Sequence, residues 1–135
     1  RFIMGLLRNF DLNLINAQCF VETGLESGHG MDHALTYPQF KKLHSVEINE
    51  KFYDFCSSKY KHIDKVKLWL GSSEERIKEI VEDIAEFESC FFWLDAHLPS
   101  ADGIGFAERA FGDTHEIKQI YDHEGYLYIS PKKAS

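Results

Sequence analysis

The sequence predicts an α/β fold in which a mainly parallel sheet lies between two layers of helices. Short apolar runs alternate with amphipathic segments, the connections between them are short, and a polar residue follows each apolar run. The apolar runs predict strands at about residues 19–23, 43–48, 66–70 and 90–94. The last of these is the most apolar run in the chain and is expected to be a central strand, buried on both faces. Right-handed crossovers between parallel strands follow from this alternation.

Helices are indicated by apolar residues at helical spacing and by capping residues. They are predicted at about residues 2–10, 30–37, 50–60 and from residue 73 onwards. Pro38 ends the second helix, and Asn49 can cap the third, in which Phe52, Phe55 and Cys56 are expected to face inward. Ser72 and Glu75 have the spacing of a capping box at the start of the fourth helix.

The regular pattern weakens after residue 97. Residues 98–113 are predicted to be mainly a long loop, residues 115–121 a short helix and residues 126–130 a final strand. We therefore expect one domain, with an N-terminal helical part at residues 1–17, a ligand-binding core at 18–97 and an irregular part at 98–135.

Composition limits the class of partner. The chain has 135 residues and a net charge of −7, and its lysines are scattered, which argues against a nucleic-acid partner. It contains no apolar run of 18 residues, which argues against a membrane span. The odd number of cysteines, Cys19, Cys56 and Cys90, all in apolar surroundings, predicts buried thiols in a reducing compartment, hence a cytoplasmic protein.

Residues 19–32 have the pattern of a ligand-binding corner. An apolar strand ends in Glu22, and Gly24, Gly28 and Gly30 then surround a polar turn before a helix begins. Glycine is required where the backbone turns with positive φ or where a ligand approaches too closely for a Cβ atom. A strand, a glycine-rich turn and a helix start together predict a nucleotide-type site.

Polar residues also follow the other predicted strands. Glu22, Glu47, Ser72 and Asp95 lie at or just beyond the carboxyl ends of four successive strands. Because parallel strands end at the same edge, these side chains are expected to meet where such sheets bind ligands. An acidic residue in the position of Glu47 can accept both hydroxyls of a ribose.

These motifs resemble those of class I S-adenosylmethionine-dependent methyltransferases. The segment from Glu22 through Thr23 and Gly24 to Gly30 resembles motif I, and Glu47 resembles the acidic end of the second strand. Leu70-Gly71-Ser72-Ser73 looks like the segment beside the adenine, where aspartate is commoner than serine, and Phe92-Trp93-Leu94-Asp95-Ala96-His97 looks like motif IV. The resemblance covers about residues 18–98 and is closest to small O-methyltransferases that act on sugars and other small molecules.

The resemblance implies a Rossmann-like three-layer α/β/α sandwich and a role for each matched residue. Gly24 would let the backbone approach the methionine part of the cofactor, and Glu22 would hold its ammonium, directly or through the loop. Glu47 would bind the ribose hydroxyls, and Ser72 and Ser73 would flank the adenine. The expected cofactor-binding residues are Glu22, Thr23, Gly24, Gly28, Gly30, Glu47, Ser72, Ser73 and Asp95.

The acceptor side is expected at Asp95 and His97. His97 could act as the base that deprotonates a hydroxyl, and Asp95 could line the cofactor pocket or ligate a divalent metal. The predicted reaction is methyl transfer to a small-molecule acceptor, at an oxygen, with neither nucleic acid nor membrane as partner; a homo-oligomer stays open. A cluster of His29, Asp32 and His33 could suggest a metal site, although the helix dipole and solvent explain Asp32 and His33 as well.

Two other functions remain open. An NAD(P)-dependent oxidoreductase needs Gly-x-Gly-x-x-Gly, which Gly28 and Gly30 begin, but His33 occupies the third glycine position. The two negative charges of a dinucleotide would also be repelled by Glu22 and Glu26. A partial or degenerate domain without catalytic activity is the other alternative, because a full class I methyltransferase has seven strands and this chain shows fewer, so its sheet is expected to be incomplete at the C-terminal end.

Overall fold

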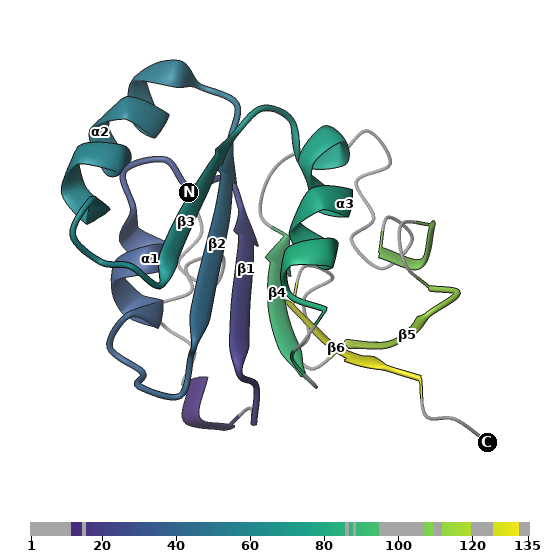
Figure 1. Cartoon of the computed structure of the whole chain (residues 1–135). Helices are drawn as coiled ribbons and strands as arrows, with labels where there is room; N and C mark the ends of the chain where they lie inside the picture. Colours follow the sequence, from purple (N-terminus) through teal and green to yellow (C-terminus); the bar gives the residue numbers. More distant parts are fainter. Residues whose placement is uncertain are drawn as a thin grey trace.

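The computed structural model describes residues 12–14, 16–85, 87, 89–94, 107–109, 112–119 and 126–132. A six-stranded sheet in the order β3-β2-β1-β4-β6-β5 organises them (Figure 1). The strands are β1 (Cys19–Thr23), β2 (Lys42–Glu47), β3 (Val66–Leu70), β4 (Cys90–Leu94), β5 (His115–Gln119) and β6 (Tyr126–Pro131). The helices are α1 (His29–Ala34), α2 (Glu50–Tyr60) and α3 (Ser73–Asp83), preceded by a 3₁₀ turn at Leu12–Leu14.

The sheet is parallel at one side and antiparallel at the other. Strands β1 to β4 are mutually parallel, with Cys19 opposite Lys42 on β2 and opposite Cys90 on β4. Strand β6 runs antiparallel to both β4 and β5. The Rossmann-like α/β prediction is therefore confirmed, as are the four parallel strands and the final strand.

The short helix predicted at residues 115–121 is wrong, because His115–Gln119 forms strand β5. Its side chains alternate between half-buried and exposed positions, and Ile117 lies opposite Ile129 of β6. The strand thus depends on a partner more than ten residues later in the chain, which local helical spacing cannot reveal.

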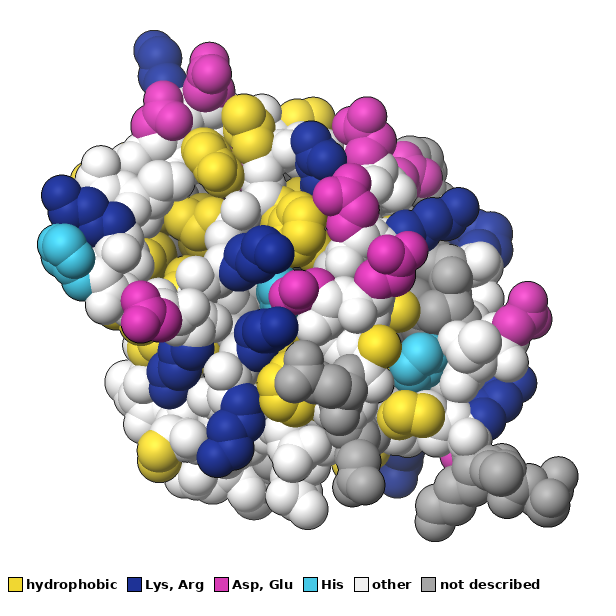
Figure 2. Space-filling view, in the orientation of Figure 1, with side chains coloured by type: hydrophobic (Ala, Val, Ile, Leu, Met, Phe, Trp, Pro, Cys, Tyr) yellow, Lys and Arg dark blue, Asp and Glu magenta, His cyan; other side chains and the backbone are white. Residues whose placement is uncertain are grey.

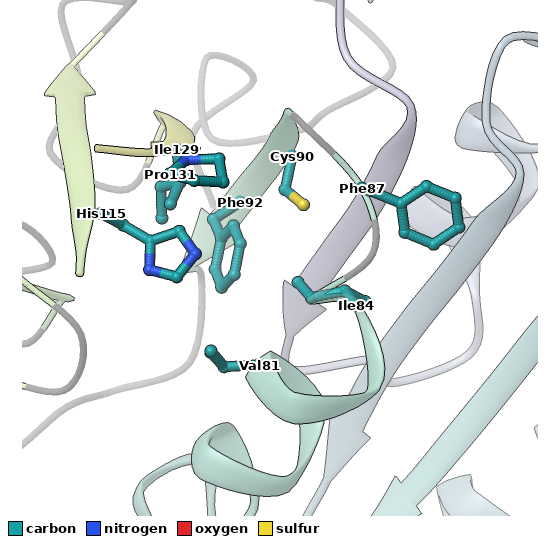
Figure 3. Close-up of a pocket in the computed structure, with 8 residues that line it drawn as sticks. All are labelled: Val81, Ile84, Phe87, Cys90, Phe92, His115, Ile129 and Pro131. Carbon is teal, nitrogen blue, oxygen red and sulfur yellow. The ribbon is translucent and has the colours of Figure 1, made fainter. Parts of the chain in front are cut away.

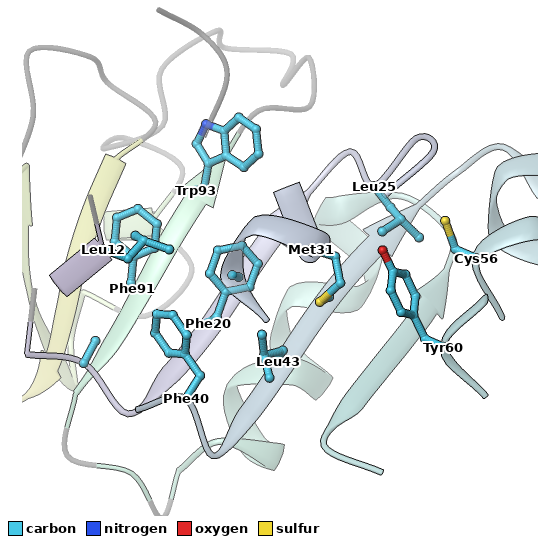
Figure 4. Close-up of a cluster of buried hydrophobic side chains, with 12 residues drawn as sticks. Leu12, Phe20, Leu25, Met31, Phe40, Leu43, Cys56, Tyr60, Phe91 and Trp93 are labelled. Atoms are coloured by element: carbon cyan, nitrogen blue, oxygen red, sulfur yellow. The ribbon is translucent and has the colours of Figure 1, made fainter. Parts of the chain in front are cut away.

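Each face of the sheet has its own core. Helices α1 and α2 cover one face and α3 covers the other (Figure 1). Alternate residues of a strand point to opposite faces, so Phe20 and Phe91 pack on the side of α1 and α2, whereas Val21 and Phe92 pack on the side of α3. The ring centroids of Phe20 and Phe91 lie 6.1 Å apart within the first cluster, which Figure 4 shows. Strand β4 is buried on both faces, as predicted.

The seam between α3 and the antiparallel side of the sheet is closely packed. Val81 of α3 and Ile84, which follows the helix as its C-cap, face Phe92 of β4, Ile129 of β6 and His115 of β5 around a small void (Figure 3). The void measures about 10 Å³, which is no more than a single water molecule requires. This seam is therefore part of the core and not a ligand site.

The cysteines behave as the sequence predicts. Cys19, Cys56 and Cys90 are buried free thiols. Burial raises the pKa of Cys56 to about 11, and burial together with the neighbouring Cys90 raises that of Cys19 further. Such thiols are poor nucleophiles. Within the described ranges, no helix is both long and apolar enough to cross a bilayer.

A buried histidine joins β2, β3 and α3. His44 is fully buried, and its Nδ1 accepts the indole N–H of Trp69 at 2.8 Å. Because that nitrogen accepts, the neutral ring carries its proton on Nε2, which lies 3.1 Å from Asp83 Oδ2. Asp83 also pairs with Lys42 and Lys67, at 3.1 and 3.7 Å. Figure 2 shows this face, where basic side chains lie beside acidic ones.

Burial lowers the pKa of His44 from 6.5 to about 4; Asp83 opposes this shift, and Lys42 and Lys67 add to it. The unfolded chain therefore binds this proton at a higher pH than the fold does, so stability falls as the pH drops from about 6.5 to about 4. The loss should reach about 2–3 kcal/mol at the acid end.

Urea unfolding of the wild type and His44→Asn at pH 7 and pH 4.5 measures this effect. Asparagine can still accept from Trp69 but does not titrate, so the variant should lose less stability on acidification than the wild type. An equal loss in both proteins would contradict the assignment.

Candidate functional site

Backbone hydrogen bonds bring the ends of β1, β2 and β3 together at one edge of the sheet. The amides of Gly24 and Leu25 donate to the carbonyl of Val46, at 2.9 and 3.3 Å. The amide of Gly71 donates to the carbonyl of Glu47 at 3.0 Å. The segments that follow these three strands therefore lie side by side, as the positions of Glu22, Glu47 and Ser72 predict. Asp95 and His97 lie outside the described residues.

Glu22 lies beneath the first turn of α1. Its side chain is 1% exposed, and its Oε1 accepts from the hydroxyl of Ser45 at 2.9 Å. Its Oε2 lies against Gly30, where it would collide with an added Cβ atom. Glu22 therefore contacts the protein itself on both oxygens, and the role toward the cofactor that the resemblance implies stays a prediction. Thr23, the last residue of β1, is also fully buried.

The glycines of the turn have two structural roles. Gly24 and Gly28 have positive φ values of 85° and 96°, which disfavour any side chain. A Cβ atom at Gly28 would collide with the Tyr60 hydroxyl, and one at Gly30 would collide with the Trp93 ring. The glycine-rich pattern thus reflects packing within the protein at Gly28 and Gly30.

Glu47 joins two loops through its carboxylate. It is 6% exposed; its Oε1 accepts from the amide of Glu26 at 2.8 Å and its Oε2 from the amide of Asn49 at 2.9 Å. A carboxylate has about four lone-pair sites, so each oxygen keeps the capacity to accept one further hydrogen bond. Glu47 can therefore hold the turn after β1 and still accept from a ligand hydroxyl.

Ser72 and Ser73 form the start of α3. The Ser72 hydroxyl donates to Glu75 Oε1 at 2.8 Å and accepts from the Glu75 amide at 3.2 Å, which confirms the predicted capping box. The hydrogen bond from the Ser72 hydroxyl, together with one from the Ser72 amide to the same Oε1 at 3.4 Å, lowers the pKa of the exposed Glu75 carboxyl. Ser73 is the first helical residue and is 9% exposed. The Ser72 side chain is thus already engaged within the protein.

An exposed apolar residue at this edge was not identified from the sequence. Ile48 follows Glu47 directly and is 74% exposed. Phe52, in the first turn of α2, is 39% exposed. Figure 2 shows hydrophobic side chains at the end of the molecule where β2 ends and α2 begins. The sequence pattern places Ile48 inside the second strand, where it would be buried. In the structure β2 ends one residue earlier, at Glu47, and Ile48 lies outside the strand.

The prediction that Phe52 and Phe55 face inward is wrong, since Phe55 is 57% exposed as well. Helix α2 buries Cys56 and Tyr60, which lie four residues apart on one face. Phe55 lies about 100° around the helix from Cys56, and Phe52 lies at the end of α2 that extends past the sheet.

The residues around Asp32 do not gather as a metal site. In the part of the chain that the structure describes, no group of three His, Cys, Asp or Glu side chains could hold a metal ion. Asp32 instead contacts Lys59 Nζ and the Tyr60 hydroxyl, each at 2.6 Å. His33 contacts Tyr37, with ring centroids 5.2 Å apart.

The sequence matches no protein-family model and no curated protein. Solved structures do resemble the fold. An S-adenosylhomocysteine-bound methyltransferase from Podospora anserina, PaMTH1, superposes with a TM-score of 0.56 at 15% identity, over 96% of this chain and 78% of that one.

Two further structures give weaker superpositions. The O-methyltransferase TomG of Streptomyces achromogenes, in complex with S-adenosylmethionine, has a TM-score of 0.47 at 13% identity, over 96% of this chain and 80% of that one. Streptococcus pneumoniae Sp1610, provisionally described as a tRNA (m1A22) methyltransferase, has a TM-score of 0.49 at 12% identity, over 98% and 70%.

The superposition on PaMTH1 covers nearly all of this chain, and therefore nearly all of its mainly parallel sheet. The chain therefore has the fold of the class I S-adenosylmethionine-dependent methyltransferases.

Proposed function

We propose that this chain binds S-adenosylmethionine at the edge formed by the ends of β1, β2 and β3, and that it transfers the methyl group to an oxygen of a small molecule. The observation that carries the proposal is the position of Glu47. Its buried carboxylate closes β2, holds the turn after β1 and lies next to the exposed Ile48. A carboxylate that can accept hydrogen bonds from hydroxyl groups, beside an apolar surface, fits the ribose and adenine of a nucleoside.

Charge distinguishes between two nucleoside cofactors. Glu22, Glu26 and Glu47 place three carboxyl side chains around the turn. S-adenosylmethionine carries positive charge at its sulfonium and its ammonium, so acidic surroundings favour it. The diphosphate of NAD(P) would be repelled by the same groups. This difference supports the sulfonium cofactor over the dinucleotide.

The other predicted residues act mainly through the backbone and the packing of the turn. Gly24, with positive φ, lets the main chain approach the amino-acid part of the cofactor. Gly28 and Gly30 let the turn approach Tyr60 and Trp93, and Glu22 supports the turn from below. The backbone at Ser72 and Ser73 would flank the adenine. Thr23 is the buried last residue of β1, directly before the turn.

When bound, the cofactor supplies an electrophilic methyl group on its sulfonium. The protein contributes by placing the acceptor in line with that group, and for a hydroxyl acceptor a base must also remove its proton. We assign the base to His97, and we place Asp95 in the cofactor pocket, with a divalent metal at Asp95 as the alternative. A small-molecule acceptor suits a chain with a net charge of −7 better than a polyanion does.

Isothermal titration calorimetry with S-adenosylhomocysteine tests whether the chain binds the proposed cofactor. We expect one site with a micromolar dissociation constant, because the ligand presents the ribose, adenine and ammonium that the edge fits. A folded sample that releases no heat at millimolar ligand would disprove the proposal. Fluorescence titration with NADH tests the alternative of an NAD(P)-dependent oxidoreductase, which requires that NADH binds. A stable dimer without affinity for either ligand would favour a non-catalytic domain.

The substitution Glu47→Ala should weaken binding of S-adenosylhomocysteine about tenfold, by removing hydrogen bonds to the ribose. Because Glu47 also holds the amides of Glu26 and Asn49, calorimetry should include an analogue that lacks both ribose hydroxyls. The wild type should prefer the normal ligand, whereas the variant should bind the two alike. If the variant keeps the full preference, Glu47 does not contact the ribose.

The substitution Ile48→Ala should weaken the binding of S-adenosylhomocysteine about fivefold, because apolar contact with the adenine is lost. The midpoint of urea unfolding should change little, because Ile48 is 74% exposed. Ile63→Ala is the matched control, since Ile63 is also partly exposed but follows α2 at its other end. Equal affinities of both variants and the wild type would remove Ile48 from the site.

A further inference from the structure

We propose that the second half of α2 acts as a clamp that holds the glycine-rich turn after β1 in its binding shape. Cys56, Lys59 and Tyr60 are the positioning residues of this clamp. The inference rests on the proposed function, because the turn is part of the cofactor site proposed above. None of the three side chains needs to touch the cofactor to act in this way.

The clamp contacts three consecutive carbonyls of the turn. The Cys56 thiol donates to the carbonyl of Glu26 at 3.3 Å, and Lys59 Nζ donates to that of Ser27 at 3.3 Å. The Tyr60 hydroxyl lies 3.0 Å from the carbonyl of Gly28. Cys56 and Tyr60 belong to the buried face of α2, which Figure 4 shows beside Leu25.

Asp32 links the clamp to α1. Its carboxylate lies 2.6 Å from Lys59 Nζ and 2.6 Å from the Tyr60 hydroxyl. A phenol has one proton, so Tyr60 donates to either Asp32 or the Gly28 carbonyl at any moment. Burial, and then Asp32, raise the pKa of Tyr60, so the hydroxyl keeps its proton and remains a donor at physiological pH.

The turn needs such support because its local conformation is unfavourable. Glu26 has a φ of 50°, in the left-handed region that a residue with a side chain rarely adopts. Gly28, at the start of α1, provides no side-chain cap, and α1 has only six residues. Backbone of this kind persists only where surrounding contacts fix it. On the other side of the turn, Glu47 holds the amide of Glu26.

The clamp should therefore determine how much of the protein is ready to bind. A turn that is already fixed costs the ligand no ordering entropy, whereas a released turn must be ordered on binding. Each lost clamp contact should reduce the affinity for S-adenosylhomocysteine about five- to tenfold. Cys56 and Tyr60 belong to the core on this face, but Tyr60→Phe keeps the ring and Cys56→Ala removes only one sulfur atom, so the global fold should persist.

Hydrogen exchange of the ligand-free protein tests the clamp without reference to the cofactor. In Tyr60→Phe, Cys56→Ala and Lys59→Met, the amides of residues 26–32 should exchange at least fivefold faster than in the wild type, while those of β1 and β4 keep their rates. Cys56→Ser keeps a donor toward Glu26 and should restore slow exchange. Tyr53→Phe is the control on the same helix, because Tyr53 faces the groove between α2 and β3.

Calorimetry with S-adenosylhomocysteine on the same variants then tests the consequence. Faster exchange with five- to tenfold weaker binding, and recovery of both in Cys56→Ser, supports the clamp. Unchanged exchange rates in all three variants overturn the clamp. If the wild type binds the ligand, variants that exchange faster but bind as tightly as the wild type overturn it as well. If the wild type does not bind the ligand, the proposed function fails, and the exchange rates alone decide whether α2 fixes the turn.

Discussion

The carboxylate of Glu47 connects the parts of the candidate site. One oxygen holds the amide of Glu26 in the turn after β1, and the other holds the amide of Asn49, which caps α2. Two loop residues that lie 23 positions apart in the chain, Glu26 and Asn49, are thus fixed to the same strand end. Because the carboxylate is almost fully buried, these hydrogen bonds also compensate for the loss of its hydration.

Helix α2 makes the second connection to the same turn. Asn49 starts the helix by accepting from the amides of Lys51 and Phe52, so the position of α2 depends on the end of β2. Eleven residues later, the Tyr60 hydroxyl donates a hydrogen bond to the carbonyl of Gly28. The turn is therefore held at both sides by groups whose positions follow from β2. Among the described residues, the turn after β1 is thus contacted both by the end of β2 and by the second half of α2.

Much of the fold could be predicted from local patterns. The strand at residues 66–70 and the capping box of Ser72 and Glu75 follow from spacing alone, and both are confirmed. Strand β5 could not be predicted, because HEIKQ becomes a strand only when β6 supplies its hydrogen-bonding partner. The outward positions of Phe52 and Phe55 were missed for a similar reason: the sequence shows a helix but not where the sheet beneath it ends.

The sequence by itself determined the order of strands and helices from β1 to β4 and the placement of Glu22, Glu47 and Ser72 at one edge, because apolar periodicity and capping act between near neighbours. The tertiary structure decided what those residues contact. It placed Glu22 beneath α1, engaged Ser72 in a helix cap, exposed Ile48 and set Tyr60 against Gly28. Such contacts depend on how close elements 20 to 30 residues apart approach each other, and only the packing of the whole sheet fixes that distance.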